Sequence, residues 1–220
     1  MTARLDRGLF WGLSLTALLL AGASRVEIIG RPRLDRIREE ELLYYPSGFA
    51  VRQAAIGYEI AAADIAWLRG IQYYGEHRIT DQKYALIGHV MDVVTTLDPA
   101  FVQPYVFGAF VMAQELKQPE RGIELLERGI RANPENWKLW FEAGFLHYVC
   151  LHDIAGAARC FTLASRMPGH DPYVERFAAF ANQRAGNTGM AILLWKQVLA
   201  TGNEYMQDVA RRELKRLGAL

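Results

Sequence analysis

The sequence lacks the linear motifs that mark most enzymes and metalloproteins. It contains no phosphate-binding loop, no Ser-His-Asp order and no paired-carboxylate motif, so we do not expect an enzyme. Only two cysteines are present, and no C-x-x-C or C-x-x-C-H pattern occurs for zinc or haem. A repeat-scaffold enzyme stays open as a third hypothesis, because a catalytic site assembled from scattered helices leaves no linear motif.

The sequence also lacks an excess of charge of either sign. Basic and acidic residues number 25 and 24, which removes the basic footprint that nucleic-acid binding needs. Eight prolines and 51% hydrophobic residues do not fit a disordered chain and allow a buried core. We therefore expect one elongated domain whose partners are other proteins, with neither a nucleic acid nor a small-molecule substrate.

A short cluster of His147, Cys150 and His152 invites a metal interpretation, because cysteine and histidine are common zinc ligands. The spacing opposes it, since His147 and Cys150 share a helix face while His152 points elsewhere. We expect no metal and no cofactor. Cys150 and Cys160 flank a turn between paired helices, so a disulfide is open in an oxidising compartment, but free buried thiols are favoured.

The N-terminal region contains an uncharged apolar run between Arg7 and Arg25. Its 17 residues reach roughly 25 Å as a helix, the low end of what spans a bilayer. This predicts an N-terminal membrane segment over 1–24, which is either a signal anchor or a signal peptide with Ala21 and Ala23 at an A-x-A-like cleavage site. No cysteine follows the run, so lipoprotein attachment there is excluded. A buried helix of a soluble protein is the remaining alternative.

Two groups of arginines give opposing topology signals. Arg4 and Arg7 favour an N-terminus inside, whereas five arginines lie on the other flank: Arg25, Arg31, Arg33, Arg36 and Arg38. We favour a single-pass protein of a bacterial-type inner membrane with a periplasmic repeat domain, because a short apolar run followed by small residues is typical of export signals. A cytoplasmic repeat domain, or secretion after cleavage near Ala23, is the alternative.

A pattern with a period of 34 to 35 residues runs through the rest of the chain. Two sets of positions keep it, namely Ile87, Gly122, Ala157 and Ala191, and Met91, Leu126, Phe161 and Trp195. A fixed period of this size predicts stacked helical hairpins. The pairs Asp98-Pro99 and Asn133-Pro134 are expected to stop a helix where the next hairpin begins.

Two of the predicted first helices carry a bulky aromatic residue followed by a small pair. In one of them Trp140 precedes Ala143 and Gly144, and 35 residues earlier the equivalent residues are Tyr105, Gly108 and Ala109. Small side chains allow a helix to approach its hairpin partner closely, while the aromatic residue fills the groove beside that contact.

This pattern resembles the tetratricopeptide repeat (TPR) family, whose units are helix-turn-helix pairs with an aromatic residue, a small pair and a closing proline. The resemblance covers about residues 64–202 and is strongest from Trp140 to Pro168. It implies an all-α fold, a right-handed α-solenoid of about four hairpins over 64–99, 100–134, 135–168 and 169–202. We expect a stalk over 25–48 and capping helices over 49–63 and 203–220.

Two units depart from the family pattern. The first has an unusually long turn, which we place through His77, Arg78, Ile79 and Thr80. The fourth lacks the opening aromatic residue and the closing proline, so its register is less strongly specified.

The resemblance implies a concave surface, lined by the first helices, that holds a peptide or a neighbouring subunit. Its partner-binding residues in this chain are Gln72, Val106, Phe110, Gln114, Lys138, Phe141, Phe145, Tyr148 and Gln183, with Leu68, Glu76, Glu175 and Asn182 on the same faces. Family members that grip an acidic C-terminal tail use Lys and Asn, but Phe110 and Phe145 stand where the amide is needed, so this clamp is not expected. An aromatic centre favours a hydrophobic helix or strand of a partner. Alternatively, Phe141 and Phe145 are core residues between hairpins.

These features predict a membrane-anchored scaffold or adaptor of the cell envelope, such as an assembly factor or accessory subunit of a membrane complex. The alternative is a permanent structural subunit whose outer faces pack against neighbours and whose groove selects nothing.

Overall fold

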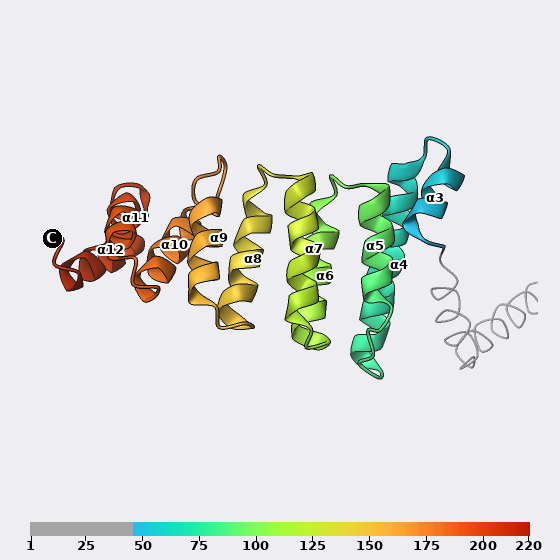
Figure 1. Ribbon diagram of the computed structural model, residues 1–220, viewed down its shortest axis with the longest axis horizontal. Helices are drawn as coiled ribbons and strands as arrows, with labels where there is room; N and C mark the ends of the chain where they lie inside the picture. The colour runs from blue at the N-terminus through green and yellow to red at the C-terminus, as the bar shows by residue number, and fades with distance from the viewer. Residues whose placement is uncertain (1–45) are drawn as a thin grey trace, which may run out of the picture. The chain divides into compact units, whose positions relative to one another are not determined.

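The computed structural model describes residues 46–220, which form one unit that contains helices and no strand (Figure 1). The predicted all-α fold is therefore confirmed for this part of the chain. The membrane segment predicted over 1–24, and most of the stalk predicted over 25–48, lie outside the described residues. Within residues 46–220, every helix is too short or too polar to cross a bilayer.

The helices follow one another as antiparallel pairs along the described chain (Figure 1). Helix α4 packs on α5, α6 on α7, α8 on α9 and α10 on α11, and each pair then contacts the next. The bounds are α3 (Gly48–Ala55), α4 (Glu59–Ile79), α5 (Ile87–Leu97), α6 (Val102–Phe110) continued by the π-helical turn η1 (Val111–Glu115), α7 (Pro119–Ala132), α8 (Trp137–Val149), α9 (Ile154–Ala164), α10 (Pro172–Arg184), α11 (Thr188–Thr201) and α12 (Glu204–Arg216).

The turn inside each pair contains one residue in the left-handed conformation. These residues are Gln82, Lys117, His152 and Gly186, with φ of 58°, 57°, 54° and 79°. Their spacing of 35, 35 and 34 residues equals the period of the apolar positions, so the repeat is present in the backbone as well as in the side chains. Only the last of the four is a glycine, the residue that adopts this conformation without steric cost.

The closing prolines act as predicted. Helix α5 ends at Leu97 and α7 at Ala132, directly before Asp98-Pro99 and Asn133-Pro134. The opening aromatic residue of the following helix then donates a hydrogen bond to the proline carbonyl. Tyr105 Oη lies 3.3 Å from Pro99 O, and Trp140 Nε1 lies 3.4 Å from Pro134 O. This bond ties each of these first helices to the end of the previous pair.

Small residues lie where paired helices approach most closely, as the sequence predicts. A Cβ atom added at Gly144 would lie 2.8 Å from Cδ1 of the Phe161 ring, and one added at Gly122 would lie 2.8 Å from the backbone oxygen of Ala109. Because a backbone atom cannot rotate away as a side chain can, Gly122 sets the approach of α7 to α6.

The helix expected over 49–63 is divided in the structure. Helix α3 ends at Ala55, and Ile56 and Gly57 both have positive φ, 41° and 89°. Two successive left-handed residues cannot continue a right-handed helix. Helix α4 therefore starts at Glu59, earlier than the expected boundary at residue 64, and α3 packs mainly on α5.

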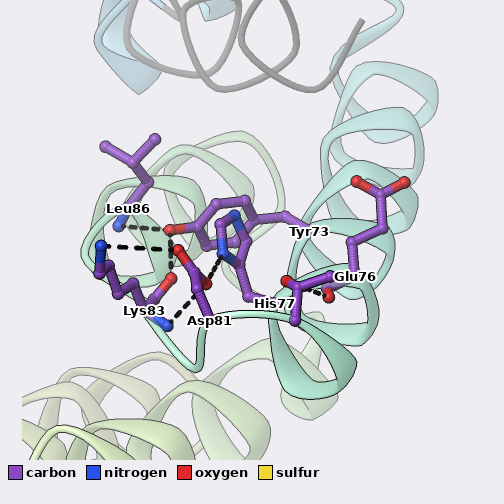
Figure 2. Close-up of polar contacts among 7 residues, drawn as sticks. Tyr73, Glu76, His77, Asp81, Lys83 and Leu86 are labelled. Atoms are coloured by element: carbon purple, nitrogen blue, oxygen red, sulfur yellow. Dashed lines mark hydrogen bonds and ion pairs between the residues drawn. The ribbon is translucent and has the colours of Figure 1, made fainter. Parts of the chain in front are cut away.

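The turn of the first pair also differs from the expectation. Helix α4 continues through Ile79, so His77 is helical and buried, and the turn follows it. His77 Nδ1 lies 2.5 Å from Asp81 Oδ1, and this hydrogen bond lowers the pKa of the Asp81 carboxyl. Lys83 Nζ lies 3.9 Å from Asp81 Oδ2, so the same carboxylate forms a second, exposed pair (Figure 2).

The phenol of Tyr73 holds the segment that follows α4 in place. Tyr73 donates its hydroxyl hydrogen bond to Lys83 O at 3.0 Å and accepts one from the Leu86 N–H at 3.4 Å (Figure 2). Both partners lie beyond the end of α4, so a buried ring of that helix anchors the connecting segment.

Candidate partner-binding site

The predicted partner-binding residues of the first two pairs are spread along the surface. Gln72 of α4 is exposed, Val106 of α6 is half-buried, and Phe110 at the end of α6 is 46% exposed. Gln114 lies in the π-helical turn, where its Nε2 donates a hydrogen bond to the Cys150 sulfur at 3.2 Å. None of these four residues lines the pocket described below.

The predicted residues of α8 lie mostly against the core. The Phe141 ring centroid is 5.2 Å from that of Phe161 and 5.3 Å from that of Phe177, so it belongs to an aromatic cluster between helices. Phe145 and Tyr148 are half-buried beside the same core. Lys138 is exposed, with its ammonium 5.7 Å from the Trp137 ring.

Two residues placed on the concave faces, Glu175 and Asn182, are buried instead. They are 5% and 4% exposed. The Glu175 carboxylate accepts hydrogen bonds from Gln197 Nε2 at 2.6 Å and Thr201 Oγ1 at 2.8 Å, and Asn182 donates one to Thr162 Oγ1 at 2.8 Å. Helix α10, the first helix of the fourth pair, therefore turns a different side to the core than the sequence predicts, because these polar groups form their hydrogen bonds inside the fold.

An open pocket of about 660 Å³ lies among α10, α11 and α12, the red end of the chain in Figure 1. Helix α10 contributes a run of pocket residues at helical spacing: Arg176, Phe177, Phe180, Gln183 and Arg184. Phe180 is 41% exposed, although it lines the pocket. Of the nine predicted partner-binding residues, only Gln183 lines this pocket.

Helices α11 and α12 supply the other wall through a chain of hydrogen bonds. Trp195 Nε1 donates to Gln183 Oε1 at 2.7 Å, and Gln183 Nε2 donates to Glu213 Oε2 at 2.9 Å. Arg216 Nη1 lies 3.0 Å from both oxygens of Glu213. Val209 of α12 is the aliphatic residue of this wall. The one carboxylate that lines the pocket is thus already paired.

The two arginines of α10 are held by rings rather than by carboxylates. The Arg184 guanidinium lies 5.2 Å from the centroid of the Phe180 ring, and its Nη1 donates to Tyr148 Oη at 2.7 Å. The Arg176 guanidinium lies 5.6 Å from the Phe177 centroid. Neither arginine forms an ion pair with any residue in the described range. Each guanidinium has five N–H donors, so donors remain for a ligand.

Sequence reasoning therefore identified one pocket residue, Gln183, and one residue that supports the pocket, Tyr148. It missed Arg176, Phe180 and Arg184. A usable signal was present, since these three follow an i, i+4, i+8 spacing that puts them along one side of a helix.

The thiols and histidines form no obvious reactive centre. Cys150 and Cys160 are free thiols, both half-buried rather than fully buried, and burial raises the pKa of Cys160 to about 11. His147 Nδ1 faces the Asp153 carboxylate at 3.0 Å, and His152 occupies a turn. Among residues 46–220, no three His, Cys, Asp or Glu side chains lie close enough to hold a metal ion.

Comparison of the chain with models of known protein families and with curated proteins found no match.

Proposed function

We propose that this chain is a membrane-tethered scaffold that holds a partner protein in the pocket among α10, α11 and α12. One observation supports this most strongly. Arg176 and Arg184 have no ion pair among the described residues, and each lies over an aromatic ring. The pocket that they line also contains the apolar side chains of Phe180 and Val209. Arginine and aromatic side chains are the residues enriched at protein interfaces and at their energetic centres.

We further propose that the helix pairs form a right-handed α-solenoid of the TPR type. The common period of the left-handed turn residues and of the apolar positions supports this. So do the closing prolines and the small residues at close helix contacts. In such a solenoid the first helices of successive pairs line one continuous surface, and α10 contributes to it.

The apolar run between Arg7 and Arg25 is proposed to tether the scaffold to a bacterial-type inner membrane, with the repeat domain in the periplasm. A tether raises the effective concentration of the pocket for partners in the same membrane. A C-terminal alkaline phosphatase fusion tests the topology. Activity in intact cells supports a periplasmic repeat domain, and an inactive but stable fusion contradicts it.

The proposed function is tested by capture from native membranes. The tagged full-length chain is solubilised in mild detergent, and co-purifying proteins are identified for the wild type and for two variants. Phe180→Ser changes an exposed pocket ring, and Leu193→Ser changes a residue of α11 that is 59% exposed and does not line the pocket. We expect one partner set to be lost only with Phe180→Ser. Equal recovery with both variants would contradict the proposal.

The permanent structural subunit remains the second candidate, because one face of α4 carries three exposed apolar side chains beside the polar Gln72 and Glu76. Ile65, Leu68 and Ile79 lie on that face at helical spacing and are 55%, 60% and 84% exposed. In the same capture, stoichiometric recovery that survives Phe180→Ser and is lost with Ile65→Ser and Leu68→Ser together would favour this candidate.

A further inference from the structure

The pocket arginines and the ring between them form a regular array on α10. Arg176, Phe180 and Arg184 are separated by four residues each, so their Cα atoms span about 12 Å along the helix axis. Successive members are rotated by about 40° around that axis, which places Phe180 midway between the two arginines. Along the helix axis Phe180 therefore lies between the two arginine positions, and the Arg184 guanidinium lies 5.2 Å from the centroid of the Phe180 ring.

An extended peptide matches this spacing. A strand rises about 3.3 Å per residue, so residues four apart in a bound peptide are separated by about 13 Å. Side chains at i, i+2 and i+4 of a strand point to the same side. A peptide bound along α10 would therefore direct its first and fifth side chains at the two arginines and its third side chain at the Phe180 ring.

The net positive charge of the pocket favours acidic side chains at the first and fifth positions of the bound peptide. The pocket is lined by three arginines and one glutamate, and that glutamate, Glu213, is occupied by Arg216 and Gln183. Arg176 and Arg184 lie over rings, and one nitrogen of Arg184 donates to Tyr148 Oη. The remaining N–H donors of the two guanidinium groups stay available for a ligand. A carboxylate accepts two parallel hydrogen bonds from the edge of a guanidinium group.

We infer that the pocket binds an extended acidic segment of the partner with the pattern Asp/Glu-x-Φ-x-Asp/Glu, where Φ is a large apolar residue. The two carboxylates pair with Arg176 and Arg184, and the apolar side chain packs on Phe180 and Val209. This inference rests on the proposed function, because it names the chemistry of the segment that the scaffold holds.

The test measures binding of labelled peptides to the full-length chain in detergent micelles. The probe is a fluorescein-labelled peptide Gly-Ser-Glu-Ser-Leu-Ser-Glu-Ser-Gly, and its anisotropy is followed as protein is added. We expect saturable binding that weakens as sodium chloride rises from 0.05 M to 0.5 M. Replacing both glutamates by glutamine, or the leucine by serine, should weaken binding by roughly fivefold or more.

Variants of the protein test whether Arg176 and Arg184 are the residues that bind the two carboxylates. Arg176→Gln and Arg184→Gln should each raise the dissociation constant roughly fivefold, whereas Arg212→Gln, an exposed arginine of α12 outside the pocket, should leave it unchanged. The double variant Arg176→Glu with Arg184→Glu should lose the acidic peptide and gain the peptide in which lysines replace both glutamates. That reversal cannot arise from misfolding.

Two results would overturn the inference. One is equal binding of the glutamine and glutamate peptides, and the other is equal weakening by Arg212→Gln and Arg184→Gln. Failure of the inference is distinguishable from failure of the proposed function. If membrane capture is lost with Phe180→Ser but kept with Arg176→Gln and Arg184→Gln together, the scaffold function stands and the acidic ligand is wrong. If all three substitutions leave capture intact, the proposed function itself fails.

Discussion

Trp195 donates the hydrogen bond of its indole nitrogen to the side-chain oxygen of Gln183 at 2.7 Å. An indole nitrogen can only donate, so this contact fixes which end of the Gln183 amide is the oxygen. The amide nitrogen then faces Glu213 and holds its carboxylate. One buried ring of α11 thus determines the polar wall of a pocket that α10 and α12 build.

Replacing Gln183 should destabilise the fold through Trp195. In Gln183→Leu the indole N–H of a side chain that is 1% exposed loses its acceptor, and an unsatisfied buried donor costs about 1 to 3 kcal/mol. The free energy of unfolding, measured by urea titration, should fall by that amount. Gln72→Leu, a change at an exposed glutamine, is the control and should alter it by less than about 0.5 kcal/mol.

Phe141 and Phe110 should separate core from surface among the predicted partner-binding residues. Phe141 packs against three other rings within 5.3 Å, so Phe141→Ala should cost about 3 to 5 kcal/mol, close to what a marginally stable domain can lose. Phe110 is 46% exposed, and Phe110→Ala should cost less than half as much. Thermal unfolding followed by circular dichroism measures both, and equal losses would contradict these placements.

Gly186 should be less replaceable than another exposed glycine of the chain. A Cβ atom meets nothing within 4 Å at either Gly186 or Gly75, but Gly186 has φ of 79° in a turn while Gly75 lies inside α4. Gly186→Ala should therefore destabilise by about 1 kcal/mol through backbone strain. Gly75→Ala should stabilise by about 0.5 to 1 kcal/mol through helix propensity. Chemical denaturation gives both values, and equal signs would refute the explanation.

The two thiols should react at different rates. Burial raises the pKa of Cys160 to about 11, which leaves about a hundredfold less thiolate near neutral pH than an ordinary thiol with a pKa of 9.0 has. Burial also raises the pKa of Cys150, but the Lys117 ammonium opposes the rise. Iodoacetamide at pH 8 should label Cys150 first, as peptide mass spectrometry would detect. Faster labelling of Cys160 in the folded protein would contradict its burial.

The repeat and the ends of its helices could be predicted from the sequence because both arise from local chemistry. A proline such as Pro99 or Pro134 cannot continue the helix that precedes it, and glycines such as Gly122 and Gly144 mark close helix contacts. The break at Ile56 had only a weak local signal. Ile56 itself argues against it, because a β-branched residue disfavours the left-handed conformation, but Gly57 directly after it is a residue that often follows a helix end.

The site was harder to predict than the fold because side-chain register depends on tertiary contacts. Glu175 reads as a surface residue until Gln197 and Thr201, more than 20 residues away, are known to satisfy its carboxylate. Its burial turns α10 so that Arg176 and Phe180 line the pocket. A glutamate is seldom buried unless it is paired, and a single sequence does not reveal the partners.

Photo-crosslinking from the pocket in native membranes tests the central claim most directly. Benzoylphenylalanine is placed at Phe180 in the pocket, and at Leu193 on α11 as the control, in the full-length chain. The scaffold account predicts one discrete protein adduct from position 180 that is absent from position 193. It also predicts loss of that adduct when Arg176→Glu and Arg184→Glu are added. The same adducts from both positions, or none from position 180, would contradict it.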